Sequence, residues 1–252
     1  MASKEVTILY YSDNKIDPDI QLLVLNNLRS MQNPIVSVTQ KPIDLGKNIC
    51  VGDIGSSWLN LYRQLKTAAE AATTKYVATA EHDCLYTQEH YDWTPPRDDT
   101  FYYNENVWFL QMDTKHEELR GMFSTYWETE RKALSQLVCN RELLIADLNE
   151  KLSLLDEHEW VKKSLLFAGE PGVTRIKEAQ KWARTSKGVS LYKYISEYLE
   201  AQKSDIFRNE LPNLDIRHDG NFTGPKRGKN RRYELEGWGS LHGIIERHGR
   251  PE

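Results

Sequence analysis

TKYVATAEHDCLY, residues Thr74–Tyr86, is the stretch from which the fold can be predicted. Its run over residues 76–80 is apolar and β-branched and has the length of a buried strand. The run ends abruptly in Glu81, His82 and Asp83. A buried strand that carries carboxylates at its C-terminal end places them in the crevice where open α/β sheets bind ligands. The stretch therefore predicts an acidic ligand site, for which the alternative is a pair of solvated loop charges.

The length and composition of the chain set wider limits. Its 252 residues, of which 39% are hydrophobic, suffice for one large domain or two small ones. No apolar run approaches the roughly 20 residues that a membrane-spanning helix needs, and the first five residues lack the apolar stretch of a signal peptide. Cys50, Cys84 and Cys139 show no paired metal spacing. We expect a protein of the cytoplasm, or of the host cytoplasm if it is viral, with no membrane partner, zinc site or disulfide framework.

Strand and helix patterns alternate before the acidic strand. Glu5–Tyr11 and Pro34–Val38 are typical of strands, and the helix between them begins at Asp17-Pro18. A short third strand near Asn48–Val51 and a helix over 58–72 follow. This order predicts an α/β fold with a mostly parallel sheet flanked by helices.

The pattern changes after the acidic strand. Phe101–Tyr103 and Val107–Leu110 predict a hairpin or a bent strand pair. Glu128–Leu155 carries apolar residues at steps of three and four, which is typical of an amphipathic helix, and Leu214–His218 resembles a short strand. We therefore expect a helical C-terminal half. The chain is divided into a core at 1–113, a helical lid or acceptor side at 114–204, and a strand with a basic loop at 205–252 that completes the site.

A second pattern precedes the acidic strand, where Gly52, Gly55, Asn60 and Arg63 have the spacing Gly-x-x-Gly-x-x-x-x-Asn-x-x-Arg. Together with the ending Glu81-His-Asp, it resembles the GT-A fold glycosyltransferases, in particular the family-2-type group that uses nucleotide sugars. In that family the acidic strand ends in Asp-x-Asp, which holds the metal and the diphosphate; here a glutamate replaces the first aspartate. The resemblance covers about residues 5–112 and 214–227 and implies a hexosyl- or pentosyltransferase of GT-A (Rossmann-like) fold.

The resemblance implies roles for several residues of the N-terminal part. Asp83 matches the metal-binding aspartate of the family and would hold Mn²⁺ or Mg²⁺ with diphosphate oxygens. Ser12 and Asp13 end the first strand, where the family binds the nucleotide base. Glu81 would reach the donor sugar or ribose, or the metal through water. Arg63 would neutralise the ligand or orient an aspartate, and a salt bridge on the helix face is its alternative.

The C-terminal half supplies four further candidates. Family members often return a histidine to the metal and close a basic loop over the diphosphate, and His218 followed by Lys226 and Arg227 fits both features. A structural histidine is the alternative, with His242 as a second choice for the ligand. Glu170 lies in the constrained turn Ala-Gly-Glu-Pro-Gly and is the candidate base of an inverting enzyme, within hydrogen-bond reach of the acceptor hydroxyl. Helix capping or a solvent-facing turn is its ordinary explanation, and a retaining enzyme needs no such base.

The acceptor is predicted from a basic cluster. Five cations lie within seven residues, Lys226–Arg232, and aromatic residues that we expect to be exposed lie at 86–93, Tyr233 and Trp238. The net charge of −4 argues against polyanion binding over the whole surface but permits a local patch. Cations and aromatics suit a nucleic-acid backbone and an extruded base. The chain looks like the small bacteriophage glycosyltransferases that modify DNA at 5-hydroxymethylpyrimidines such as 5-hydroxymethylcytosine; a solvated loop is the alternative.

The sequence therefore predicts a metal-dependent glycosyltransferase that moves a sugar from a UDP-sugar to a hydroxyl, with double-stranded DNA carrying hydroxymethylpyrimidines as the preferred acceptor. A polysaccharide or protein acceptor is the alternative within the same class. A nucleotidyltransferase is the alternative from a different class of enzyme. A glycine-rich nucleotide loop directly after the first strand would favour it, and Tyr10–Asn14 contains no such loop. A non-catalytic nucleic-acid-binding module is the third alternative, and it would not need Asp83. The sugar, the stereochemical outcome and the oligomeric state stay open.

Overall fold

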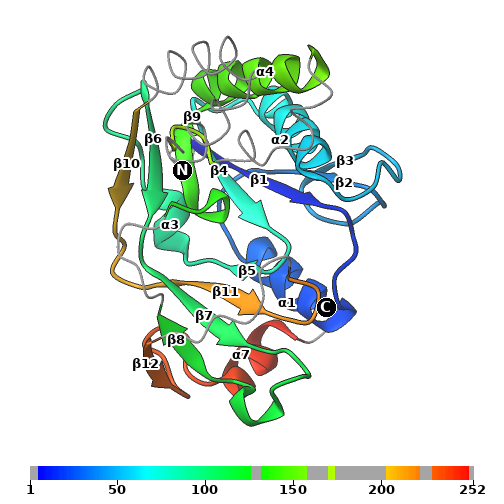
Figure 1. Cartoon of the computed structure of the whole chain (residues 1–252). Helices are drawn as coiled ribbons and strands as arrows, with labels where there is room; N and C mark the ends of the chain where they lie inside the picture. Colours follow the sequence, from blue (N-terminus) through cyan, green and yellow to red (C-terminus); the bar gives the residue numbers. More distant parts are fainter. Residues whose placement is uncertain (1–4, 126–131, 158–169, 174–202, 222–228, 250–252) are drawn as a thin grey trace, which may run out of the picture.

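The computed structural model of the chain describes residues 5–125, 132–157, 170–173, 203–221 and 229–249. Figure 1 shows a central sheet with helices on both faces and a second, smaller sheet beside it. The central sheet has seven strands in the order β10-β6-β9-β4-β1-β2-β3. Their bounds are β1 Val6–Ser12, β2 Ile35–Thr39, β3 Lys47–Cys50, β4 Tyr76–Glu81, β6 Thr100–Asn104, β9 Leu137–Asn140 and β10 Lys203–Phe207.

The central sheet is mostly parallel. β1 pairs in parallel with β2 and β4, β2 with β3, and β6 with β10. β9 pairs antiparallel with both β4 and β6. Because β9 opposes both neighbours, β4 and β6 point the same way and end at the same edge of the sheet. The predicted α/β class, with a mostly parallel sheet flanked by helices, is confirmed.

Both faces of β1 are buried. Ile8 and Tyr10 pack into one core and Leu9 and Tyr11 into the other, because successive side chains of a strand point to opposite faces. Burial on both faces explains why the parallel strands have continuous apolar sequences rather than alternating ones.

Helices cover each face of the central sheet. α1 (Pro18–Arg29) packs into the core of Ile8 and Tyr10, and α2 (Trp58–Ala71) and α4 (Arg141–Glu157) pack together into the other core. Asp17 and Ser57 cap α1 and α2 by accepting hydrogen bonds from backbone N–H groups of the first turn. The structure also contains α3 (Gln88–Asp92) and α7 (Leu241–His248). Among the described residues, no helix combines the length and the apolar character needed to cross a membrane.

The second sheet has five strands in the order β12-β8-β7-β11-β5. Their bounds are β5 Cys84–Leu85, β7 Val107–Gln111, β8 Phe123–Thr125, β11 Asn213–Arg217 and β12 Lys229–Arg232. β6 and β7 are close in the chain but belong to different sheets. They therefore form no hairpin, and the chain bends between them. At the bend, the Asn104 side chain accepts the N–H of Asn106 at 2.9 Å. The bend carries the chain from the central sheet to the second one (Figure 1).

The helical region that we expected at 114–204 lies partly outside the described residues, which omit 126–131, 158–169 and 174–202. After residue 126 the described residues form β9, β10, β11 and β12 as well as α4 and α7. Within the run that we expected to be one helix, Leu137–Asn140 is a strand and the α-helix begins only at Arg141. A short apolar run is compatible with a buried strand or a buried helix. β9 and β10 lie beyond residue 113 in the chain but belong to the central sheet. The division at 113 and 204 therefore stays a prediction about function.

Candidate functional site

The candidate site lies where strands of both sheets end. β4 ends at Glu81 beside Tyr11 of β1, which is its partner in the parallel register. The chain then turns through His82 and Asp83 into β5, which pairs with β11 of the second sheet. β11 ends at Arg217, so the next residue, His218, reaches the same place. This convergence results from the sheet pairing, and no local pattern in the sequence encodes it.

Asp83 is the centre of this group. Its Oδ2 accepts a hydrogen bond of 3.0 Å from the side-chain amide of Asn221 and lies 3.6 Å from Nε2 of His218. The thiol of Cys84 lies 3.8 Å from Oδ1. Burial opposes ionisation of the carboxyl group, but the contact with His218 and neighbouring positive charges such as those of His82 and Arg217 outweigh it and hold the pKa of Asp83 below its usual value. Asp83 is therefore a carboxylate at neutral pH.

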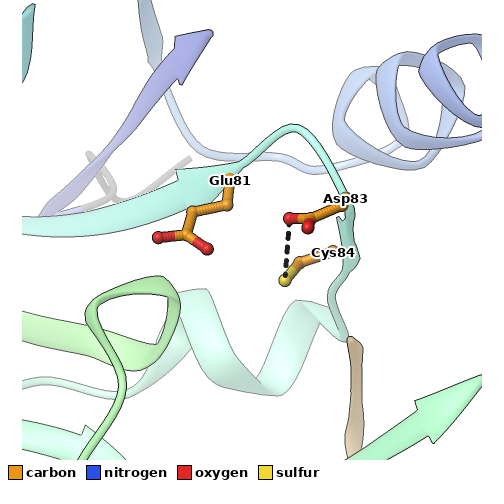
Figure 2. A group of neighbouring side chains, drawn as sticks. All are labelled: Glu81, Asp83 and Cys84. Carbon is orange, nitrogen blue, oxygen red and sulfur yellow. Dashed lines mark hydrogen bonds between the residues drawn. The ribbon is translucent and has the colours of Figure 1, made fainter. Parts of the chain in front are cut away.

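Glu81 supplies a second carboxylate to the group. The ligand atoms of Glu81, Asp83 and Cys84 all lie within 4.8 Å of one another, and Figure 2 shows the two carboxylates facing the same space. The hydroxyl of Tyr11 donates to Glu81 at 2.8 Å and fixes its direction. Burial and the nearby carboxylates raise the pKa of Cys84, so its thiol stays protonated. Two carboxylates beside a neutral thiol fit a hard, oxygen-seeking divalent ion such as Mg²⁺ or Mn²⁺ better than zinc.

His218 is placed as predicted beside Asp83, but its hydrogen bonds describe a more specific state. Nδ1 accepts the backbone N–H of Gly220 at 3.2 Å, so in this arrangement a ring proton is placed on Nε2, facing Asp83. Nε2 is buried and has no partner within hydrogen-bond distance among the described residues. Metal binding through Nε2 would require the proton to move to Nδ1 and the N–H of Gly220 to turn away. The observed arrangement therefore suits a proton donor to an anion, and ligation stays a prediction.

Ser12 and Asp13 lie on the other side of the site, and both are held by hydrogen bonds. The Ser12 hydroxyl accepts the N–H of Asn14 and lies 2.9 Å from Nδ1 of His82. Asp13 accepts hydrogen bonds from the N–H of Lys15 and from the hydroxyl of Ser56. Burial opposes ionisation of Asp13, but these bonds and the positive charges of His82 and Lys15 keep its pKa below the usual value. The nucleotide-base role of these two residues stays a prediction.

The sequence interpretation did not predict the contacts of His82. From the sequence we expect His82 to pack or to support the residues that bind the ligand, and the structure places it 2.9 Å from Ser12 and 3.8 Å from Asp13. It therefore joins the end of β1 to the end of β4. The only sequence signal was its place between two carboxylates. Asn221, which donates to Asp83, and Tyr11, which donates to Glu81, were also missed, because each belongs to a different segment of the chain.

The glycine and asparagine of the pattern before α2 have a structural role. Gly55 has a φ of +79°, which favours glycine, and its carbonyl accepts a hydrogen bond of 3.1 Å from the side chain of Asn60. Gln40 donates to the same carbonyl at 2.9 Å. These bonds hold the turn beside Asp13. Arg63 is exposed on α2, and its role at the ligand stays a prediction.

Glu170 lies against the edge of the central sheet. Pro171 accepts a hydrogen bond from the hydroxyl of Tyr103 on β6, and Gly172 accepts one from Ser204 on β10. Burial raises the pKa of Tyr103 and the charge of Glu170 adds to this effect. No interaction described in the structure joins Glu170 to Asp83, and its role as a base stays a prediction. Lys226 and Arg227 lie outside the described residues.

The expectation of exposed aromatics after β4 is wrong for most of them. Tyr86, His90 and Tyr91 are buried and their rings pack against one another, with Tyr86 stacked on His90. The hydroxyl of Tyr86 accepts the N–H of Glu81 and donates to Ser135, so this tyrosine supports the acidic strand from within the core. Trp238 is also buried, and Tyr233 is 56% exposed. The aromatic part of the argument for nucleic acid therefore rests on Tyr233, next to the exposed strand β12.

Comparisons with known proteins give distant structural neighbours. No protein-family model matches the chain, and no curated protein matches its sequence. A glycosyltransferase involved in the glycosylation of the major capsid of PBCV-1 is similar with a TM-score of 0.42 and 8% identity, over 83% of this chain and 92% of that one. The glycosyltransferase GlyE of Streptococcus pneumoniae TIGR4 has a TM-score of 0.47 and 10% identity, over 98% and 60%. The bifunctional IspDF of Campylobacter jejuni has a TM-score of 0.40 and 12% identity, over 82% of this chain and 50% of that one.

The chain thus spans about half of IspDF and somewhat less than two thirds of GlyE. At these similarities the α/β class rests on the strand order and strand directions of this chain itself.

Proposed function

We propose that this chain is a metal-dependent glycosyltransferase of GT-A type that transfers a sugar from a UDP-sugar to a hydroxyl group. The observation that carries the proposal is the position of Asp83. It is an ionised carboxylate at the end of the parallel strands, it shares its space with Glu81, and it meets His218 from the second sheet. Open α/β sheets bind ligands at this edge.

Each part of the site has a proposed task. Asp83 and Glu81 would hold Mn²⁺ or Mg²⁺, which when bound neutralises the diphosphate of the donor. Ser12 and Asp13 would lie against the base or ribose, and Arg63, Lys226 and Arg227 would contribute positive charge. His218 would donate a proton or a hydrogen bond from Nε2 to an anionic oxygen.

In the transfer, the bond between the anomeric carbon and the diphosphate oxygen breaks, and a bond from that carbon to the acceptor oxygen forms. The acceptor hydroxyl loses its proton, and in an inverting enzyme a carboxylate takes it. Glu170 remains our candidate for that carboxylate. A retaining enzyme would not use it in this way.

For the acceptor, we propose 5-hydroxymethylpyrimidine in DNA. The support is β12, an exposed edge strand of sequence KNRR followed by the exposed Tyr233. A positively charged strand suits the phosphate backbone. The burial of Tyr86 and Tyr91 removes part of the original support. A polysaccharide or protein acceptor is therefore tested beside DNA, by following sugar uptake from UDP-sugars into hydroxymethylated DNA, unmodified DNA and glycans. Uptake by glycans without any uptake by hydroxymethylated DNA would contradict the DNA proposal.

The nucleotide site is tested by isothermal titration of the protein with UDP, with and without Mn²⁺. We expect metal-dependent binding that Asp83→Ala abolishes and that Asp98→Ala retains. Asp98 is a suitable control because its carboxylate is exposed and pairs with Lys75 at 3.0 Å. Binding of UDP by Asp83→Ala at the affinity of the unaltered chain, or no UDP binding under any metal condition, would contradict the proposal.

A further inference from the structure

One face of the second sheet is polar although it is buried. Strand pairing places Phe109 opposite Ser124 of β8 and Asp215 of β11, and places Gln111 opposite Arg217. Residues directly opposite each other point to the same face. We call these five residues the polar face of the second sheet. None is more than 7% exposed, whereas the other face carries apolar residues that join the main core.

The polar face adjoins the candidate metal site. Asp215 is the register partner of Cys84, whose thiol lies within 4.8 Å of the ligand atoms of Glu81 and Asp83. Arg217 directly precedes His218, and its charge helps to hold the pKa of Asp83 below the usual value. The polar face therefore borders the space in which we propose that the diphosphate binds.

Two members of the polar face hold each other in place. Arg217 donates to Asp215 at 2.7 Å, and its guanidinium lies 4.2 Å from the centre of the Phe109 ring. This ion pair balances charge within the face and stiffens its centre. The charge available to an anionic ligand is correspondingly small.

Each of the remaining two members has one unpaired side-chain oxygen. Oε1 of Gln111 and Oγ of Ser124 are buried and have no hydrogen-bond partner among the described residues. The two side chains are diagonal neighbours on β7 and β8, a separation of about 7–8 Å. Buried polar atoms are nearly always paired, so two unpaired ones on one face indicate a partner that the described residues do not supply.

Buried residues elsewhere show the usual arrangement. Gln64, which is 4% exposed, donates to the carbonyls of Ser12 and Val38 at 2.9 Å each. Ser37 is fully buried, donates to Leu45 and accepts a hydrogen bond from Asn48. Gln111 and Ser124 are as deeply buried as these two residues but lack the partners.

We propose that Gln111 and Ser124 bind the hydroxyl groups of a sugar ring, an inference that rests on the proposed glycosyltransferase function. An amide oxygen accepts hydrogen bonds and a serine hydroxyl both donates and accepts, so the pair matches a neutral ligand rich in hydroxyls. An anion would meet the Gln111 oxygen and the Asp215 carboxylate, and Arg217, the cation on this face among the described residues, is already paired with Asp215. The sugar has two possible sources, the transferred sugar of the donor and a saccharide acceptor.

The first test needs no ligand. Gln111→Leu and Ser124→Ala remove polar atoms that have no partner, so the thermal midpoint of the ligand-free protein should stay the same or rise. The matched controls Gln64→Leu and Ser37→Ala remove paired groups and should lower it by several degrees. If Gln111→Leu and Ser124→Ala lower the midpoint as much as their controls do, the two side chains have structural partners and the proposal is overturned.

The second test identifies the source of the sugar. UDP, UDP-glucose, UDP-galactose and UDP-N-acetylglucosamine are titrated with Mn²⁺ into the unaltered protein, Gln111→Leu and Ser124→Ala. If the donor sugar occupies the face, both variants should keep the UDP affinity and lose tenfold or more for the best UDP-sugar. If a saccharide acceptor occupies the face instead, both variants should keep the UDP-sugar affinities of the unaltered protein. Saturation-transfer signals of methyl glycosides bound to the protein–UDP–Mn²⁺ complex should then disappear in both variants.

Two outcomes distinguish a wrong sugar subsite from a wrong proposed function. If the unaltered protein binds UDP but neither variant alters UDP-sugar or glycoside binding, the sugar subsite is wrong and the proposed function stands. If the unaltered protein binds no UDP, the proposed function fails and the sugar assignment fails with it.

Discussion

The two sides of the candidate site differ in how completely their polar groups are paired. On the side of β1, the polar atoms of Ser12 and Asp13 are engaged by their own chain. On the side of the second sheet, the buried polar atoms of His218, Gln111 and Ser124 have no hydrogen-bond partner among the described residues. The first side can hold its shape without a ligand. The second side has buried polar atoms that a ligand could pair, which is the basis of our proposal for the sugar site.

The largest expected effect comes from removing the charge of Asp83. Asp83→Asn keeps the shape of the side chain but no longer offers two anionic oxygens to a cation. We expect the rate of transfer to fall by about 10²-fold or more, since the loss concerns stabilisation of the departing charge. The measurement is kcat with saturating Mn²⁺, with thermal unfolding to show that the fold is retained. A variant with an unchanged rate would remove Asp83 from the centre of the site.

The next prediction concerns the side of β1, where the polar groups are hydrogen-bonded within the chain. Gln64→Leu leaves the carbonyls of Ser12 and Val38 without their donor, and we expect a loss of about 2 kcal/mol in the free energy of unfolding. Urea unfolding measures it, with Gln111→Leu as the control of equal size and burial. If both variants lose the same free energy, the contrast between the two sides does not hold.

His90 tests whether an unpaired buried atom always implies a ligand. Its Nε2 is buried and has no hydrogen-bond partner in the part of the chain that the structure describes, and its ring packs against Tyr86, Tyr91 and Phe207. Burial lowers the pKa of His90 from 6.5 to about 3. The folded state therefore keeps the ring neutral, whereas the unfolded state binds a proton below about pH 6.5. Stability attributable to His90 should be full above that pH and fall by about 1.4 kcal/mol per pH unit towards pH 3.

The corresponding measurement is urea unfolding between pH 7.5 and 4.5, for the unaltered chain and for His90→Phe. The variant should lose part of the pH dependence and keep its affinity for UDP. An equal pH dependence in both proteins would place the titration in other groups, and a loss of UDP binding would give His90 a role in the site.

The smallest effect is expected for Tyr11→Phe. The variant loses the hydrogen bond of 2.8 Å to Glu81 but keeps the ring in the core. We expect a cost of about 1 kcal/mol in stability and a decrease of a few-fold in the rate of transfer. Enzyme kinetics and urea unfolding measure both. A decrease as large as that of Asp83→Asn would mean that Glu81, rather than Asp83, is the principal metal ligand.

Much of the first half of the fold could be predicted from the sequence. The pattern over residues 76–80 predicted β4, which extends over Tyr76–Glu81, and the helix predicted at 58–72 is α2 at Trp58–Ala71. Local composition is sufficient here because both faces of the parallel strands are buried and the helix caps are local. The prediction failed at Leu137–Asn140, where an apolar run became a strand between β4 and β6.

The sequence by itself determined the alternation of strands and helices and the placement of Glu81 and Asp83 at the end of a buried strand. Burial and capping act over a few residues, so the pattern of side chains records them. Only the tertiary structure decided which groups meet Asp83, such as Asn221, which lies 138 residues further along the chain. It also decided that Tyr86 is buried and that Gln111 and Ser124 share one face. These are consequences of strand pairing between distant segments, which leaves no periodic mark in either segment.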